Sequence, residues 1–340
     1  MYLMVRKRKL FPIKVIIQMA IIPVLIVLVA MGYMFCIHST VRAPVEFVVA
    51  RGDSVTGVAN RLMREKLIDS TEVFKAAIRA NGGTVQRGLY DIRPGASSWR
   101  IAEMLAHGRV ATVDIVIPEG LTVKQIKNQL LGSSVLTGAV ECNAGDSAPV
   151  CNLRDGQLFP DTYRVAKGAS RLSVLELARK KMIAVEASIK KSILKLPKPL
   201  KDWGQVITLA SIVQKETPVV REMPVVASVY LNRLNKGMRL QADPTVVYAL
   251  TDGLGDMQGA ALLRGHLKTE SPYNTYRNSG LPPAPIANVG VAAIRAVLNP
   301  ADTNYLFFVA DGQGGHKFSR DYETHQKNHA KWSKIKQSRN

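Results

Sequence analysis

Residues 206–218 read VITLASIVQKETP and predict an amphipathic helix with a carboxylate at its end. Apolar residues recur at helical spacing, at positions 206, 209, 210 and 213. Pro218 disfavours the helical conformation of Thr217, so the helix is expected to end or kink there. Glu216 falls within about 20° of Leu209 on the helical wheel and therefore lies on the apolar face.

Glu216 is the candidate catalytic residue. A carboxylate at the end of an apolar stripe is partly desolvated, which raises its pKa and suits a general acid that must hold a proton near neutral pH. The alternative is a structural glutamate that pairs with an arginine or caps a neighbouring helix. Helical phase alone favours this alternative, because structural ion pairs also perturb pKa values.

The segments that follow carry side chains suited to binding a saccharide. Residues 238–250 (MRLQADPTVVYAL) lead into a loop at 270–288 (ESPYNTYRNSGLPPAPIAN) that is too rich in Pro and Gly for a regular element. Residues 304–319 (NYLFFVADGQGGHKFS) predict a hairpin with strands at 305–310 and 316–319. Amides, hydroxyls and flat aromatic faces hold sugars, and the candidate substrate-binding residues are Gln241, Asp243, Tyr248, Tyr273, Asn274 and Tyr276. Tyr248 can equally be a core residue, and the single histidine of the hairpin, His316, is more often structural than catalytic.

The N-terminal end predicts a membrane anchor. Residues 15–37 are apolar and uncharged, and about 23 helical residues reach roughly 34 Å, enough to cross a bilayer. The alternatives are a buried core helix or a cleaved signal peptide, whose apolar region usually has about 7–15 residues. Basic residues precede the run, so residues 1–14 are expected in the cytoplasm and the chain after about residue 40 outside.

The overall charge agrees with an anionic partner. The 340-residue chain carries a net charge of +20, which suits phospholipid surfaces, cell-wall polymers or nucleic acid. Nucleic acid is not expected, because the sequence has no recognisable reader motif and only 6% aromatic residues.

Residues 45–131 predict a small α+β module. Three stretches, 47–68, 88–108 and 113–131, each read as a strand, a Gly-containing turn and an amphipathic helix. The natural N-caps of these helices are Ser54, Ser97 or Ser98, and Thr122. The first stretch resembles a LysM domain, a glycan-binding fold, and the third resembles it more loosely. The alternative is a structural spacer, since the pattern is short and degenerate.

The remaining features concern cysteines, metals and cofactors. Cys142 and Cys151 lie in a loop-like stretch that would meet an oxidising compartment, so they can form a disulfide or remain free thiols. No metal-ligand spacing occurs among the six histidines or the cysteines. The sequence also shows neither a nucleotide-binding loop nor a convincing pyridoxal-lysine context, so we expect neither a metal nor a cofactor.

Several long motifs resemble the YceG-like endolytic murein transglycosylases. The resemblance covers most of the chain in the same order, and its motifs are LASIVQKET (209–217), VASVYLNRLNKGMRLQADPTVVYAL (226–250), SPYNTYRNSGLPPAPIAN (271–288), NYLFFVADGQGGHKFS (304–319) and FPDTYRV (159–165). It implies an α+β protein with an N-terminal transmembrane helix, a LysM-like module and a mixed helix and hairpin catalytic domain at 156–335. The family's catalytic glutamate falls on Glu216; some relatives carry a second glutamate two positions earlier, where this chain has Gln214.

The resemblance also implies an activity and a location. We expect a single-pass protein of the bacterial inner membrane whose extracytoplasmic domain cleaves peptidoglycan glycan strands and leaves 1,6-anhydro ends. Its expected partners are the glycan strands and the membrane, with cell-wall synthases as candidates. The alternatives are a muramidase-type hydrolase, which generally needs two carboxylates, and a non-catalytic wall-binding scaffold. The basic tail, residues 327–339, is assigned no role.

Overall fold

The structure, a computed structural model, describes residues 21–26, 29, 32, 39–143, 145–146, 148–255, 257 and 259–337. The predicted cytoplasmic segment 1–14 and most of the predicted span 15–37 lie outside these residues. Among the residues that are described, no helix has the length and apolar character needed to cross a membrane. The chain divides into two compact units, Met1–Val113 and Asp114–Asn340, both of which mix helices with small sheets, as the predicted α+β class requires.

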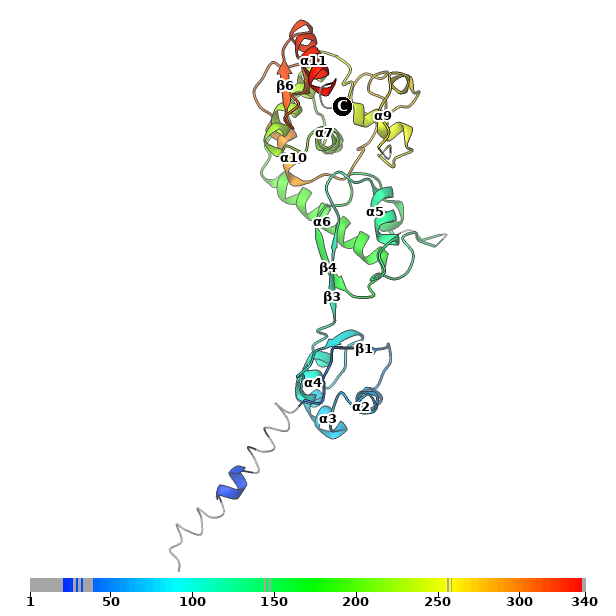
Figure 1. Cartoon of the computed structure of the whole chain (residues 1–340), viewed down its shortest axis with the longest axis vertical. Coiled ribbons are helices and arrows are strands. Elements are labelled where there is room, and N and C mark those ends of the chain that lie inside the picture. The colour runs from blue at the N-terminus through cyan, green and yellow to red at the C-terminus, as the bar shows by residue number, and fades with distance from the viewer. Residues whose placement is uncertain are drawn as a thin grey trace, which may run out of the picture. The chain divides into compact units, whose positions relative to one another are not determined.

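The first unit has the element order strand, helix, helix, strand, helix. These elements are β1 (Val45–Val49), α2 (Val55–Arg64), α3 (Thr71–Ala80), β2 (Gly88–Ile92) and α4 (Ser98–Ala106), grouped in blue to cyan in Figure 1. Strands β1 and β2 pair antiparallel, with Phe47 opposite Tyr90. Both side chains are buried, and they join a core to which α2, α3 and α4 contribute their apolar faces. The sequence did not predict α3, whose Phe74 and Ile78 are fully buried in this core.

The predicted helix starts are confirmed by side-chain caps. Ser54 accepts a hydrogen bond from the Gly57 N–H, and Ser97 accepts one from the Arg100 N–H. Thr122 forms a capping box with Gln125 at the start of α5 (Val123–Leu131). The third strand, β3 (Thr112–Val116), pairs with β4 (Thr162–Ala166).

Helix α5 belongs to the second compact unit rather than the first. Its first N–H, from Val123, donates to the Asp155 carboxylate at 2.6 Å, and the Asn288 side chain and backbone bond to Leu121 just before the helix. The segment 45–131, grouped as one module in the sequence, therefore contains the division between the two units at 113/114.

The second unit is built around helix α7 (Trp203–Glu216). Around it lie α6 (Arg171–Lys191), α8 (Met223–Asn235), α9 (Asp243–Leu250), α10 (Val291–Leu298), the antiparallel hairpin β5 (Phe307–Ala310) and β6 (His316–Ser319), α11 (Tyr322–Gln337), and the 3-10 turns η1 (Pro149–Asn152), η2 (Val220–Glu222) and η3 (His266–Lys268). Helix α7 contacts α8, α9 and α10, and it lies between α9 and α10 in Figure 1.

The apolar stripe predicted on α7 is confirmed and extended. Val206, Leu209, Ala210 and Val213 have no exposed surface, and the whole stretch from Val206 to Val213 is buried. Because the middle of α7 is buried on all sides, the helix can expose polar side chains to solvent or to a cavity only near its ends. The helix stops at Glu216 because Thr217, before Pro218, takes an extended conformation.

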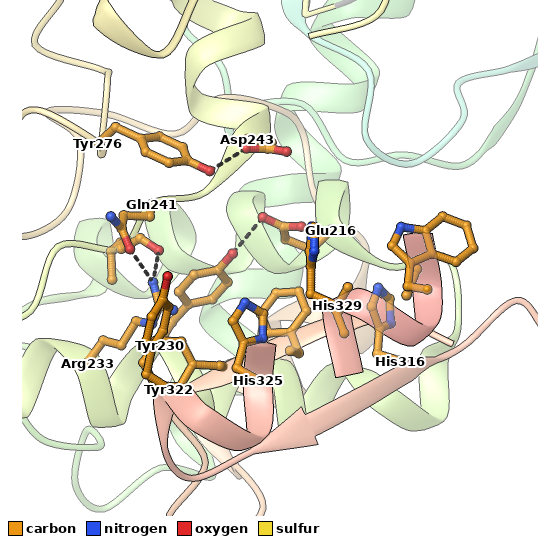
Figure 2. A pocket seen from close by; sticks show the side chains of 16 residues that line it. Glu216, Tyr230, Arg233, Gln241, Asp243, Tyr276, His316, Tyr322, His325 and His329 are labelled. Carbon is orange, nitrogen blue, oxygen red and sulfur yellow. Dashed lines mark hydrogen bonds between the residues drawn. The ribbon is translucent and has the colours of Figure 1, made fainter. Parts of the chain in front are cut away.

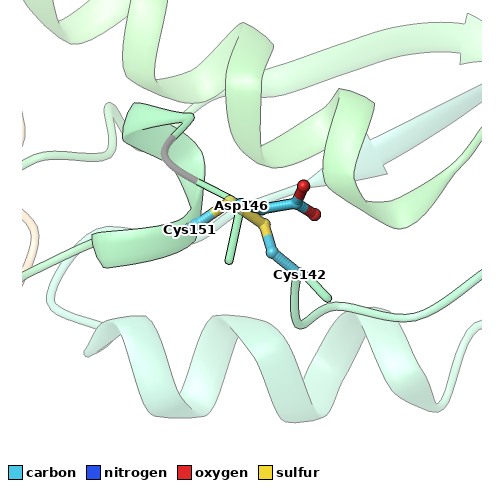
Figure 3. A group of neighbouring side chains, drawn as sticks. All are labelled: Cys142, Asp146 and Cys151. Carbon is cyan, nitrogen blue, oxygen red and sulfur yellow. A yellow bond between two sulfur atoms is a disulfide. The ribbon is translucent and has the colours of Figure 1, made fainter. Parts of the chain in front are cut away.

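Cys142 and Cys151 form a disulfide, with their Cα atoms 5.4 Å apart (Figure 3). The Asp146 carboxylate lies in the same group, within 4.8 Å of the two sulfurs. Because both sulfurs are bonded to each other, neither is available as a thiolate ligand. The bridge closes a loop whose two ends are held by the buried side chains of Val140 and Val150.

We expect reduction of this disulfide to lower the free energy of unfolding of the second unit by about 2–3 kcal/mol, the loop-entropy value for about ten residues. Chemical denaturation with and without reductant measures the difference. The matched control is the double variant Cys142→Ser, Cys151→Ser, whose free energy of unfolding should be the same with and without reductant. Equal stability of the oxidised and reduced protein would contradict the prediction.

Candidate functional site

Glu216 is half-buried at the C-terminal end of helix α7, where the helix meets a cavity of about 440 Å³. The cavity is lined by the side of α8, the start of α9, the hairpin and α11, as Figure 2 shows. A second hollow of about 470 Å³, on the side of α9, is also lined by Glu216 and Asp243. Glu216 therefore stands between two open spaces, while its backbone belongs to the end of a helix whose middle is buried.

Tyr230 of α8 is the direct partner of Glu216. Its hydroxyl donates a hydrogen bond of 2.6 Å to Glu216 Oε1. The Tyr230 ring is 2% exposed and packs edge-on against Phe308 of the hairpin, with ring centroids 5.9 Å apart. The hydroxyl is thus held in place by packing on both sides of the ring, which fixes the rotamer of the carboxyl group that it contacts.

Burial raises the pKa of Glu216 to about 7. The hydrogen bond from Tyr230 opposes this rise, because it favours the carboxylate; the nearby charge of Asp243 adds to it, and the Arg233 cation opposes it. Desolvation is the largest of these causes. The side chain can therefore exchange a proton at neutral pH, which an ordinary glutamate does not do.

Asp243, Tyr276 and Gln241 form the wall opposite the hairpin. The Tyr276 hydroxyl donates to Asp243 Oδ1 at 2.6 Å, and Asp243 is the first residue of α9. Gln241 adopts a positive φ of 49°, and its backbone N–H donates to the Thr275 carbonyl. These three predicted substrate-binding residues line the same cavity as Glu216.

Arg233, one turn after Tyr230 on α8, ties this wall to the hairpin. Its guanidinium donates to the Leu306 carbonyl at 2.6 Å and to the Leu240 carbonyl at 2.8 Å, and it lies over the Phe307 ring. A planar group with several donors can hold two chain segments in a fixed relation. Arg233 therefore sets the spacing between the two walls of the cavity.

His316, at the start of β6, is held by Glu222 of η2. Its Nδ1 lies 2.7 Å from Glu222 Oε2, and its backbone N–H donates to Glu222 Oε1. This contact occupies the Glu222 carboxylate, which does not line the cavity, whereas the Asp243 carboxylate does. His316 also lines the cavity that contains Glu216.

Three predicted residues lie outside the lining of the Glu216 cavity. The Tyr248 hydroxyl donates to Asp155 at 2.7 Å, and its ring packs on Tyr273 with centroids 4.8 Å apart. Asn274 is fully buried, and its side-chain amide donates to the carbonyls of Leu267 and Thr269. These contacts hold the 266–278 loop together; the predicted substrate-binding role of Tyr248, Tyr273 and Asn274 stays a prediction.

Gln214 points away from the cavity that contains Glu216. Its side-chain oxygen accepts a hydrogen bond from the Gly290 N–H at 3.2 Å, at the start of α10. The amide therefore links α7 to α10 and leaves Glu216 as the carboxyl group at the end of α7 that faces the cavity.

Two groups of lining residues were not predicted from the sequence. Tyr230 and Arg233 stand on one face of a helix whose motif was quoted but whose side chains were not assigned. The residues contributed by the C-terminal helix were missed because the basic tail was assigned no role; they are Tyr322, His325, His329 and Trp332. Their near-helical spacing was the available signal.

Comparisons with known proteins identify one family that this chain resembles. The model of a family described as YceG-like matches residues 47–331. A Bacillus subtilis protein named endolytic murein transglycosylase is 28% identical over 318 residues, which cover 87% of this chain and 86% of that protein. A Streptococcus pneumoniae protein of the same name is 24% identical, and the match covers 82% of this chain but 57% of that longer protein. A crystal structure of a YceG-like protein from Listeria monocytogenes has a TM-score of 0.50 and 28% identity, and the match covers 84% of this chain and 99% of that one.

The raised pKa of Glu216 predicts a pH-dependent cost to stability. The folded state holds the proton up to about pH 7, whereas an ordinary glutamate releases it near 4.5. The stabilisation from this proton is therefore complete below pH 4.5 and is lost as the pH rises through 7. Glutamine does not titrate. We therefore expect the free energy of unfolding of Glu216→Gln to rise by about 1–3 kcal/mol relative to that of the native protein when the pH is raised from 4.5 to 8.

Urea denaturation of the two proteins at both pH values measures this difference. The same comparison for Glu270→Gln, an exposed residue of the 270–288 loop, serves as the control for the substitution itself. A stability difference between native protein and Glu216→Gln that is the same at both pH values would show that Glu216 titrates normally.

Proposed function

Since the chain belongs to the YceG-like family, we propose that it is an endolytic murein transglycosylase that cleaves peptidoglycan glycan strands, with Glu216 as the general acid and base. One observation carries the proposal: Glu216 faces a cavity, and its pKa of about 7 allows it to donate and accept a proton at neutral pH. The names of the Bacillus and Streptococcus relatives supply the substrate class.

The reaction needs one titrating group. Protonated Glu216 donates its proton to the glycosidic oxygen, and the bond from that oxygen to C1 of the muramic acid breaks. The resulting Glu216 carboxylate takes the proton of the C6 hydroxyl, whose oxygen bonds to C1 and closes a 1,6-anhydro ring. No water is consumed, and Glu216 ends in the state in which it began.

The surrounding residues support each half of this cycle. The Tyr230 hydrogen bond stabilises the carboxylate that forms after the first proton transfer. Asp243 keeps negative charge near the cavity, where positive charge develops at C1 as the glycosidic bond breaks. Tyr276, which donates to Asp243, orients that carboxylate.

A muramidase-type hydrolase is the second candidate, and one observation favours it. Asp243 lines both spaces beside Glu216, so a second carboxylate is present where a hydrolase would need a base or nucleophile. The two candidates differ in their products: a hydrolase leaves reducing ends, and a transglycosylase leaves anhydro ends.

The N-terminal part suggests where the enzyme works. Residues 15–37 are proposed as a single inner-membrane span, with the two folded units outside the cytoplasm, on the basis of the apolar run and the preceding basic residues. The first unit is proposed as a LysM-like glycan-binding module, which its strand, helix, helix, strand order and antiparallel β1–β2 pair support.

Glu216→Gln is expected to lower the rate of glycan cleavage by about 10²–10⁴-fold, because glutamine can neither donate nor accept the proton. Purified peptidoglycan is digested with each protein, and the ends of the products are identified by mass spectrometry. Anhydro-muramic ends from the native protein support the proposal, and reducing ends would favour the hydrolase. Cleavage by the variant at the native rate would contradict catalysis by Glu216, and absence of cleavage by the native protein would support a non-catalytic scaffold role.

The rate of glycan cleavage should also depend on pH, and the hydrogen bond from Tyr230 to Glu216 should determine the pH at which it falls. Cleavage needs protonated Glu216, so kcat/KM is expected to fall above about pH 7. Tyr230→Phe removes the hydrogen bond that favours the carboxylate, so this fall should move to higher pH. Tyr163→Phe, which removes a buried hydroxyl that bonds to the Phe159 carbonyl, is the control and should leave the profile unchanged.

A further inference from the structure

The C-terminal helix α11 presents a row of rings to the cavity. His325, His329 and Trp332 follow one another at spacings of four and three residues, so they share one face of the helix, and all three line the cavity that contains Glu216. Figure 2 shows His325 and His329 reaching toward the space beside Glu216 from the C-terminal helix. The helix is otherwise polar and rich in lysine.

This row is fixed to the hairpin. The His325 ring stacks on Phe307, with centroids 5.2 Å apart and planes 22° apart. The Asn328 amide donates to Ser319 Oγ at 3.0 Å, which anchors the middle of the helix. These contacts place α11 as a wall of the cavity and not as a free tail.

Trp332 is seated against the turn of the hairpin. Gly312 has a φ of +81°, and a Cβ atom at this position would lie 3.5 Å from Trp332 Cζ3 and closer still to Ile335. The turn therefore passes next to the indole with no side chain between them. Trp332 remains partly exposed, so one part of a large apolar ring faces solvent in the cavity while another is supported.

The two sides of the cavity differ in chemistry. Glu216 and Asp243 lie on the side of α7 and α9, and the hairpin and α11 supply imidazoles, aromatic rings and no carboxylate to the lining. Flat aromatic rings with adjacent hydrogen-bonding groups suit the apolar face and the hydroxyls of a sugar ring. The α11 side is therefore suited to bind a sugar that is not itself cleaved.

We propose that α11 forms a saccharide subsite in which Trp332 packs on the face of a sugar next to the scissile bond and His329 hydrogen-bonds to its polar groups. This inference rests on the proposed function and adds a binding site on the C-terminal helix. It makes the enzyme selective for glycan strands that extend at least one sugar beyond the cleaved bond on the α11 side.

Kinetics with purified peptidoglycan strands test the subsite in the full-length chain. Trp332→Ala should raise KM about tenfold with little change in kcat, because stacking of an aromatic ring is worth about 1 kcal/mol or somewhat more. His329→Ala should act in the same direction. Lys331→Ala, an exposed neighbour that does not line the cavity, is the matched control and should leave KM unchanged.

Tryptophan fluorescence tests binding without turnover. In Glu216→Gln that also carries Trp99→Phe, which removes the tryptophan of the proposed glycan-binding unit, addition of glycan strands should change the emission. The further substitution Trp332→Phe should abolish that change while Trp203 remains. This readout uses an intact indole and so does not depend on whether Trp332→Ala folds.

The outcomes separate the two proposals. If the native protein cleaves strands but Trp332→Ala and His329→Ala keep the native KM, or if the emission change persists without Trp332, the subsite is wrong and the proposed function stands. If the native protein neither cleaves nor binds the strands, the proposed function is wrong and the subsite falls with it.

Discussion

The contact between the Tyr230 hydroxyl and the Glu216 carboxyl group is the interaction on which the rest of the site depends. It joins the end of the buried helix α7 to the middle of α8, with a distance of 2.6 Å between the two oxygens. A carboxyl group at a helix end would otherwise be free to rotate toward solvent. Here the hydroxyl restrains it, and the burial of the tyrosine ring restrains the hydroxyl.

The electrostatic balance at Glu216 follows from this arrangement. Burial alone would favour the protonated form strongly, and a carboxylate too costly to form could not act as a base. Tyr230 and the Arg233 cation reduce that cost, while the charge of Asp243 adds to it. The opposed effects leave the pKa near neutrality, which a group that must both give and take a proton requires.

Sequence reasoning succeeded where the physics is local. The helix at 206–218, its end before Pro218 and the caps at Ser54, Ser97 and Thr122 follow from periodicity and short-range hydrogen bonds, and each is confirmed. It failed where the outcome depends on distant partners. The Tyr248 hydroxyl donates a hydrogen bond to Asp155, 93 residues away, and the sequence near either residue does not predict this contact. The omission of α3 is a different case, because the helical spacing of Phe74, Ala77 and Ile78 is a local signal that would have predicted it.

The site residues divide in the same way. Glu216 was predicted from its helical phase and the family resemblance, and Gln241, Asp243 and Tyr276 from residue type; all four line one cavity. Composition could not predict that α11 lines the cavity, because the composition of a lysine-rich helix does not indicate which of its faces packs against the rest of the protein. Only the hairpin beneath it shows which face is covered.

The positions of Tyr230 and Arg233 on a single turn of α8 have a consequence for how this site can change. One residue sets the proton affinity of the acid, and the other fixes the width of the cleft by holding the carbonyls of Leu306 and Leu240. A displacement or rotation of α8 would alter both properties together. Substrate range and working pH are thus mechanically linked in this architecture, and a descendant enzyme could separate them only through side-chain replacements that leave the helix where it is.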